Sequence, residues 1–186
     1  MSEQLRQPVV CFAGDDYWTS NPHSRYHFMH ALHRRGHQIL WVNSIGMHMP
    51  KLGKSGFTRR VVNKLRSWGR FLRPVAPRFH VLSPIALPLF GNPRLAGWAD
   101  ASIELQVRHA YRRLGIEDPL VFASIPSYSE VILRLPRDGM VYYYSDKYAP
   151  HRNITARDEI KRRDRSLFEA ADAVFCVSRE IHAELT

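Results

Sequence analysis

Short apolar runs alternate with helix-length amphipathic stretches along the chain. The apolar runs are four to six residues long and end at turn residues, which is typical of buried β-strands. Six strands are expected, at 9–13, 38–42, 80–83, 120–124, 140–145 and 173–177. Helices are expected at 22–35, 93–114, 127–135 and 158–171. Continuous apolar strands separated by helices predict an α/β fold, with a mostly parallel sheet and helices on both of its faces.

The ends of the first predicted helix carry recognisable signals. Asn21 has the chemistry of an N-cap, Pro22 suits the first helical position, and Gly36 suits the stop. Ser178 opens another helical pattern, which the end of the sequence at Thr186 interrupts after about two turns. We therefore expect the sequence to be the first half of a longer protein.

Composition adds a regional charge to this picture. The 186 residues are 45% apolar and carry a formal net charge of +10, which excludes disorder as the main description. Thirteen Lys and Arg and no acidic residue lie between Asp16 and Asp100, whereas the remainder from Asp100 onward is near neutral. The basic half calls for an anionic partner: phosphate, nucleic acid or an acidic membrane. No apolar run approaches the roughly 20 residues that span a bilayer.

The segment 57–73 concentrates this charge. Its apolar residues recur at helical spacing, with basic residues on the opposite face, as in helices that bind anionic membranes. The candidate membrane-binding residues are Arg59, Arg60, Lys64, Arg66, Trp68, Arg70 and Arg73. The alternatives are a helix that covers the sheet with its arginines in water, and a nucleic-acid surface. The last is disfavoured, because the aromatic residues do not lie among the arginines.

Small, polar or charged residues follow most of the predicted strands, where parallel sheets bind ligands. The candidate substrate-binding residues are Gly14, Asp15, Asp16, Asn21, Ser24, Arg25, His27, Ser127 and Tyr128. Gly14 would allow a tight turn, and the following helix N-terminus, with Ser24 and Arg25, would offer donors to a phosphate. The alternative is that Asn21, Pro22 and Ser24 only cap the helix. The candidate catalytic residues are Asp146 and His23. For Asp146 the alternative is a loop carboxylate that caps nearby backbone N–H groups.

Other familiar signatures are missing or weak. The sequence has no G-x-G-x-x-G, and Gly53-Lys54-Ser55 lacks the upstream glycine of a P-loop. Four histidines between His23 and His33 would share a helix face, but no nearby carboxylate or cysteine completes a metal site, so no metal is expected. Cys11 and Cys176 lie in strand-like runs and are expected to be buried, reduced thiols.

Three segments together resemble a known family. They are Phe12-Ala13-Gly14-Asp15-Asp16, Asn21-Pro22-His23-Ser24-Arg25, and the run from Leu32 to Asn43. In this order they resemble the N-terminal half of GT-B glycosyltransferases, in particular the family 4-like enzymes of polysaccharide assembly. The later segments 141–146 and 169–178 are similar to the closing section of that half.

The resemblance implies a doubly wound, Rossmann-like domain over residues 1–186 that binds the acceptor. A C-terminal domain that holds most of the donor site would be absent from this chain, so this half alone should not transfer sugar. The implied partners are a sugar nucleotide as co-substrate, a glycan or lipid-linked acceptor, an anionic membrane and the C-terminal domain; no cofactor is implied. Asp146 or His23 would orient or deprotonate the acceptor hydroxyl.

Two functions of different classes remain. The first is the acceptor-binding half of a glycosyltransferase that acts on a cell-surface polysaccharide or lipid-linked acceptor, cytoplasmic and peripheral on the inner face of the plasma membrane. The short polar N-terminus, unlike a signal peptide, favours that compartment. The second is a basic binding module for nucleic acid or anionic lipid, without catalysis. The sugar, the acceptor and the stereochemical outcome do not follow from the sequence.

Overall fold

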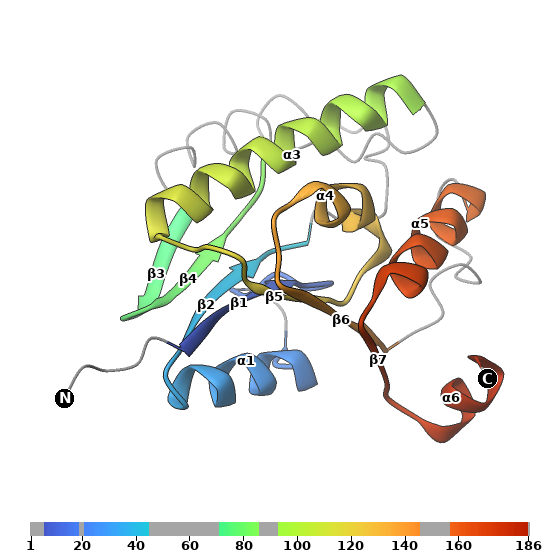
Figure 1. The fold of residues 1–186 in the computed structure, drawn as a ribbon, viewed down its shortest axis with the longest axis horizontal. Coiled ribbons are helices and arrows are strands. Elements are labelled where there is room, and N and C mark those ends of the chain that lie inside the picture. The colour runs from blue at the N-terminus through green and yellow to red at the C-terminus, as the bar shows by residue number, and fades with distance from the viewer. Residues whose placement is uncertain (1–5, 19–20, 45–70, 86–92, 146–156, 186) are drawn as a thin grey trace, which may run out of the picture.

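The computed structural model of the chain describes residues 6–18, 21–44, 71–85, 93–145 and 157–185. They form a seven-stranded sheet in the order β3-β4-β2-β1-β5-β6-β7 (Figure 1). The strands are β1 Arg6–Phe12, β2 His37–Val42, β3 Leu72–Ala76, β4 Phe79–Leu82, β5 Leu120–Ala123, β6 Gly139–Tyr144 and β7 Ala173–Cys176. Adjacent strands are parallel except β3 and β4, which are antiparallel. The predicted mostly parallel sheet is confirmed.

Helices cover both faces of this sheet (Figure 1). Helix α1, Ser24–Arg34, lies on one face. The opposite face carries α3 Pro93–Leu114, α4 Ser129–Arg134 and α5 Arg157–Ala170. Helix α6, Arg179–Leu185, follows β7, and the Ser178 hydroxyl accepts a 3.2 Å hydrogen bond from the Ile181 N–H as the expected N-cap. The fold is therefore of the doubly wound, Rossmann-like type.

The winding places a switch point at the centre of the sheet. From β1 the chain passes through α1 to β2, and β4 and β3 lie beyond β2 on that side. It then returns through α3 to β5, on the other side of β1, and continues outward to β6 and β7. The connections after β1 and β5 therefore diverge at neighbouring strand ends. Open parallel sheets bind ligands at such a switch point.

Two apolar layers fix the sheet between its helices. Val10 and Phe12 of β1 belong to the cluster under α3, α4 and α5, whereas Val9 and Cys11 belong to the cluster that contains Met29 of α1. This alternation follows from the two-residue period of a strand. Burial raises the pKa of the Cys11 thiol to about 12, so it stays a neutral core residue, as predicted. Cys176 is also free, but it is only half-buried.

Strand β3 was not predicted. Leu72 pairs with Leu82 and Arg73 with Val81 at the edge of the sheet, so the helix predicted over 57–73 is wrong at its carboxyl end. Pro74 explains this, because a proline disfavours helical backbone at the residue before it. The other candidate membrane-binding residues, Arg59, Arg60, Lys64, Arg66, Trp68 and Arg70, lie outside the described residues, so their interpretation stays a prediction.

Two predicted helix boundaries also need correction. Helix α1 begins at Ser24 with His23 at the N-cap, because the first helical hydrogen bonds go to the His23 carbonyl. Asn21 and Pro22 therefore precede the helix and do not cap it. The helix predicted over 127–135 is a 3-10 turn, Pro126–Tyr128, followed by α4. It stops before Leu135, which is extended, as expected for a residue followed by Pro136.

Candidate functional site

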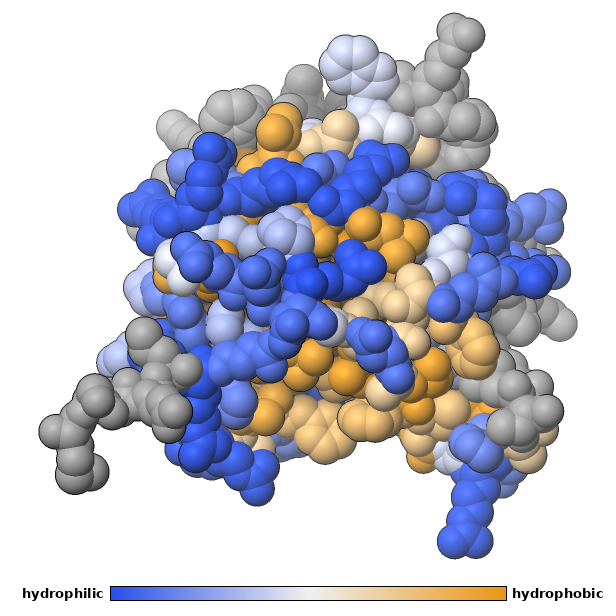
Figure 2. Space-filling model, in the orientation of Figure 1, coloured by the Kyte–Doolittle hydropathy of each residue, from blue (hydrophilic) through white to orange (hydrophobic). Residues whose placement is uncertain are grey.

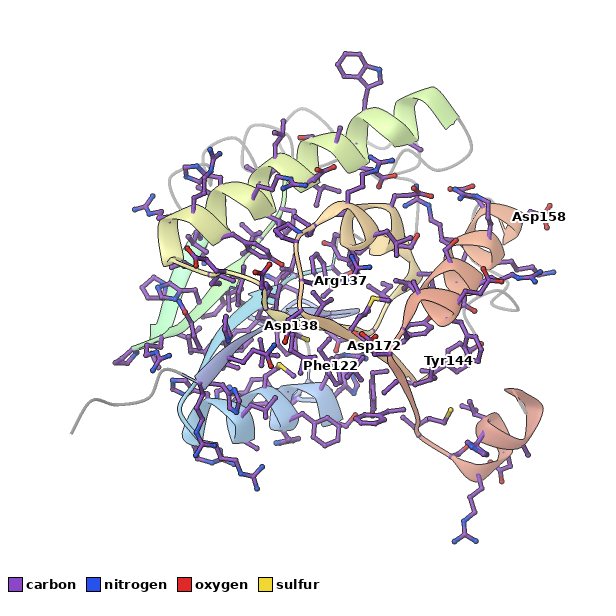
Figure 3. The ribbon with its side chains drawn as sticks, viewed as in Figure 1. Phe122, Arg137, Asp138, Tyr144, Asp158 and Asp172 are labelled. Atoms are coloured by element: carbon purple, nitrogen blue, oxygen red, sulfur yellow. The ribbon has the colours of Figure 1, made fainter. Side chains whose placement is uncertain are left out.

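The candidate site lies at the carboxyl ends of β1, β2 and β5. Tyr144 marks the same end of β6, whereas Arg137 and Asp138 lie at the start of that strand (Figure 3). Four described segments form the site: the loop after β1 (residues 13–18), the start of α1, residues 43–44 after β2, and residues 124–129 after β5. Asp146 lies outside the described residues, directly after Ser145 at the end of β6.

Asn43 joins the loops of this site. Its side chain is buried, its Oδ1 accepts a 2.8 Å hydrogen bond from the Tyr17 N–H, and its Nδ2 donates to Asp16 at 3.1 Å and to Ser83 at 2.9 Å. The Tyr128 hydroxyl donates to the Asn43 carbonyl. Through its side-chain amide and its main-chain carbonyl, Asn43 therefore links the carboxyl ends of β1, β2, β4 and β5. The sequence indicated only that Asn43 follows a strand; these contacts connect residues 26 to 85 positions apart.

Arg25 and Asp15 lie together in this site. Arg25 Nε donates a 2.6 Å hydrogen bond to Asp15 Oδ2, and both side chains are largely buried. Two predicted substrate-binding residues are thus joined to each other, and the pair fixes the loop after β1 against α1. The backbone of Gly14 is not in the left-handed region, and a Cβ there would lie 3.6 Å from the Arg25 guanidinium, an ordinary contact. The chain does bend at Gly14 and Asp15, but the bend requires neither the left-handed backbone nor the missing side chain of a glycine.

The start of α1 faces solvent beside this ion pair. His23 and His27 are exposed, and the Ser24 hydroxyl lies 2.6 Å from the Tyr143 hydroxyl. No acidic residue lies in the first turn, so no carboxylate of that turn offsets the positive end of the helix dipole. This arrangement can take an oxygen-rich, anionic ligand through helix N–H groups, hydroxyls and imidazoles. Asn21 is exposed just before it.

The remaining histidines of α1 have structural partners. His30 Nε2 lies 3.0 Å from the Tyr17 hydroxyl, and His33 Nε2 lies 2.8 Å from the Pro77 carbonyl oxygen. Both rings contact Phe79. Burial lowers the pKa of His30, which disfavours its charged form. The described residues contain no cluster of three or more His, Cys, Asp or Glu suited to a metal. The expected solvated or cleft-lining histidine face thus applies only to His23 and His27.

Ser127 and Tyr128 lie under the site, not on its surface. Both are buried, and the Ser127 carbonyl accepts a 2.9 Å hydrogen bond from Arg163 Nη1. Ser127 Oγ and Ser129 Oγ are buried without a hydrogen-bond partner among the described residues. The structure therefore gives these residues a supporting position, with Tyr128 holding Asn43.

Arg163 anchors this support from α5. Its guanidinium is 1% exposed and donates to both oxygens of Asp100, at 2.5 and 3.2 Å, and to Glu159 at 2.7 Å. Burial alone would lower the pKa of Arg163, but the hydrogen bonds to Asp100 and Glu159 raise it. Sequence reasoning missed this network, although the spacing of Glu159 and Arg163 is that of a helical ion pair.

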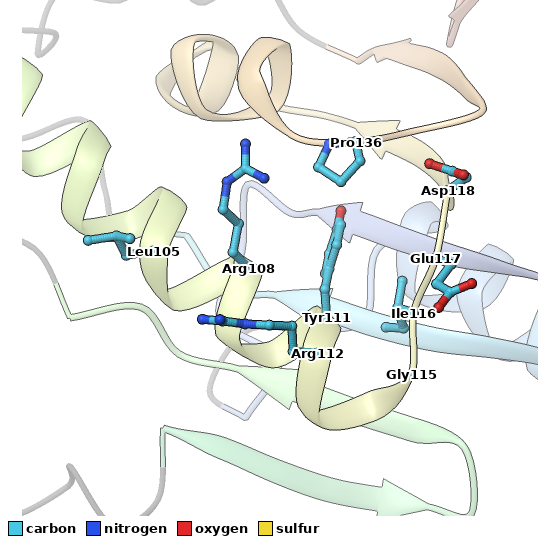
Figure 4. A pocket seen from close by; sticks show the side chains of 9 residues that line it. All are labelled: Leu105, Arg108, Tyr111, Arg112, Gly115, Ile116, Glu117, Asp118 and Pro136. Carbon is cyan, nitrogen blue, oxygen red and sulfur yellow. The ribbon is translucent and has the colours of Figure 1, made fainter.

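Two cavities are lined by described residues, and neither of these two opens between the described strand-end loops. One, of about 350 Å³, lies among α3, α4 and α5 and is lined by charged residues that pair with each other, including Asp100, Glu159 and Arg163. The larger, of about 730 Å³, lies between the last turns of α3, the segment 115–118 and Pro136 (Figure 4). It is at the amino end of β5, away from the expected ligand position.

The comparisons with known proteins concern the fold. No family model matches the chain, and no curated protein matches its sequence. Two solved structures of sucrose-phosphate synthase from Thermosynechococcus elongatus are similar to it. One matches with a TM-score of 0.56 and 12% identity over 96% of this chain and 81% of that chain. The other matches with a TM-score of 0.60 and 13% identity over 97% of this chain.

This chain shares its doubly wound α/β fold with these two structures. It spans 44% of the longer sucrose-phosphate synthase chain. At 12 and 13% identity the likeness concerns the fold and not the chemistry of individual residues. None of the helices in the described part of the chain is long and apolar enough to cross a membrane.

Proposed function

We propose that this chain is the acceptor-binding domain of a sugar-nucleotide-dependent glycosyltransferase of the GT-B type, family 4-like. The observation that carries the proposal is the doubly wound sheet, which is similar to sucrose-phosphate synthase over nearly the whole chain. Polar loops meet at its switch point, where such a sheet binds ligands. The name of the similar protein describes an enzyme that synthesises sucrose phosphate.

The acceptor binds, in this proposal, above the loop after β1 and the start of α1. Gly14, Asp16, Asn21 and Ser24 contact its hydroxyls or phosphates, and the Arg25–Asp15 pair holds the loop in place. His23 is exposed at the N-cap of α1, where its imidazole can take a proton from a sugar hydroxyl. Asp146 follows the end of β6, and its carboxylate is the other candidate for that proton.

The reaction needs a second domain to supply the donor. In this proposal a C-terminal domain holds the sugar nucleotide, and residues 1–186 alone do not transfer sugar. The acceptor is a cell-surface polysaccharide or a lipid-linked glycan, and the enzyme works at the inner face of the plasma membrane. The basic segment that contains Arg59, Arg66 and Arg70 supports this location through its charge.

A sugar-transfer assay on a protein that joins this domain to a donor-binding domain tests the proposal. Asp146→Ala should lower kcat at least tenfold with an unchanged unfolding midpoint, because a lost general base costs about 10²–10⁴ in rate. His23→Gln should lower it as well, whereas His182→Gln, an exposed histidine on α6, is the matched control. Full activity in both Asp146→Ala and His23→Gln would remove the catalytic part of the proposal.

A further inference from the structure

The outer face of α3 carries the two most exposed large hydrophobic side chains of the described residues. Trp98 is 79% and Leu105 66% exposed. They are seven residues apart, two helical turns, so they lie on one stripe about 10 Å apart along the axis. Ala101 and Ser102, on the turn between them, are also exposed. A largely exposed Trp and Leu on one stripe are unusual for a surface that contacts only solvent.

Positive charge continues this stripe toward the end of the helix. His109, Arg112 and Arg113 are exposed on the turns that follow Leu105. In Figure 2 a band of hydrophilic side chains crosses the molecule from the last turns of α3 over the region of α4 and α5, and hydrophobic side chains lie along its upper edge. The stripe therefore has apolar anchors on its earlier turns and cations on its last turns.

The acidic residues of α3 point away from this stripe. Asp100 is buried against Arg163, and Glu104 pairs with Arg108 at 2.9 Å and with Arg134 of α4 at 3.8 Å. No described carboxylate of the helix is therefore available to repel an anionic surface. Glu117 and Asp118 follow the helix, and they lie across the large cavity from Arg108 and Arg112 (Figure 4).

We propose that the outer face of α3, with Trp98 and Leu105 as its anchors, docks on an anionic lipid bilayer. Trp is favoured at the water–lipid boundary, because its ring is apolar while its N–H remains hydrated. Leu105 adds apolar area that enters the headgroup boundary, and Arg112 and Arg113 attract anionic headgroups. A protein partner is the alternative, but a helix stripe whose exposed charges are all cations, with Glu117 and Asp118 lying beyond its end, fits a uniformly anionic surface better.

The docking face is connected to the candidate site. Trp98 points outward and Asp100 inward from the same turns of α3, and Arg163 links Asp100 to the Ser127 carbonyl below the site. Docking through Trp98 therefore holds the carboxyl-end loops in a defined position relative to the bilayer. The inference extends the membrane part of the proposed function and does not depend on sugar transfer.

Vesicle sedimentation of the 186-residue chain tests the proposal. The chain should bind vesicles of 30% phosphatidylglycerol in phosphatidylcholine and bind pure phosphatidylcholine far more weakly. The double variant Trp98→Ala/Leu105→Ala should reduce the partition coefficient at least about tenfold, since each side chain loses a full apolar burial. The matched control is Phe175→Ala/Val177→Ala, which removes apolar side chains that are 53% and 48% exposed on and after β7. The control should bind like the unmodified chain.

Two further measurements separate the contribution of Trp98 and Leu105 to vesicle binding from the contribution of charge and from self-association of the chain. Arg112→Gln/Arg113→Gln should weaken binding several-fold, whereas Arg34→Gln/Arg35→Gln, an exposed pair at the end of α1, should weaken it less. Absence of vesicle binding, or unchanged binding in Trp98→Ala/Leu105→Ala, would overturn the proposal. So would a dimer in sedimentation velocity that this double variant converts to a monomer, because the face would then bind a second copy. A failed transfer assay would leave this result intact.

Discussion

Arg25 in the first turn of α1 donates a 2.6 Å hydrogen bond to the carboxylate of Asp15 in the loop after β1. The side chains are 11% and 17% exposed, so the pair is close to buried. The pair holds the loop that we assign to the acceptor against the first turn of α1. Arg25, predicted as a donor to a ligand phosphate, thus already donates from its Nε to a carboxylate of the chain.

Loss of Arg25 should destabilise the fold. In Arg25→Met the Asp15 carboxylate loses its counter-charge in a poorly hydrated position, and we expect the free energy of unfolding to fall by about 2–4 kcal/mol. Urea denaturation measures this. Asp15→Asn/Arg25→Met should cost less than the sum of the single variants, and purely additive single changes would show that the pair contributes no coupling energy.

The stability of the chain should fall as the pH drops below about 6.5. Burial lowers the pKa of His30, and burial also lowers the pKa of His80, so the unfolded state binds protons before the folded state does. The neutral rings therefore contribute stability above the unfolded pKa, and this contribution is lost as the pH falls toward the folded pKa.

The His30→Gln variant isolates one of these two groups. The decrease in unfolding free energy between about pH 7.5 and pH 5.5 should be smaller in this variant than in the unmodified chain. His182→Gln, at an exposed histidine on α6, is the matched control and should keep the full decrease. If the unfolding free energy decreased equally with pH in the unmodified chain and in His30→Gln, His30 would not be the source of the pH dependence.

The buried charge network behind the site should be sensitive to removal of one partner. Asp100→Ala leaves the 1%-exposed Arg163 without its bidentate acceptor, and we expect a loss of about 3–5 kcal/mol in urea denaturation. Asp100→Leu/Arg163→Met removes both charges and should be markedly more stable than Asp100→Ala. If the double variant were as unstable as the single one, packing and not charge would explain the effect.

The basic segment and the α3 face make separable predictions. Charge reversal at Arg59, Arg66 and Arg70 should reduce binding to anionic vesicles about tenfold or more, since each cation contributes about 1 kcal/mol near such a surface. Unchanged binding would leave membrane attachment to α3 alone. Strong salt-dependent binding of the chain to duplex DNA would instead support the non-catalytic nucleic-acid module.

The strands and most helices could be predicted because their signals are local. Continuous apolar runs mark β1, β2 and β5, and the bounds predicted for α3 are the observed ones. Strand β3 lacks such a signal: Arg73 and Pro74 interrupt its apolar residues, and it forms because β4 offers an unpaired edge.

The contacts that organise the site could not be predicted in the same way. Local sequence places Asn43 and Tyr128 at strand ends, but their hydrogen bond spans 85 residues and exists only when β2 and β5 flank β1. The Arg163–Asp100 pair depends likewise on the packing of α5 against α3. Arg25 and Asp15 are ten residues apart, and pairing them requires the turn of the chain into α1.

The central claim is that the acceptor binds at the carboxyl ends of β1, β2 and β5. Amide chemical-shift mapping of the 186-residue chain with a water-soluble, short-chain prenyl diphospho-sugar tests it most directly. We predict saturable shifts in the segments 14–18, 23–27 and 43–44, and weaker binding in His23→Ala. Shifts confined to the segment 105–118 around the amino-end cavity, or no saturable shifts at all, would contradict the account.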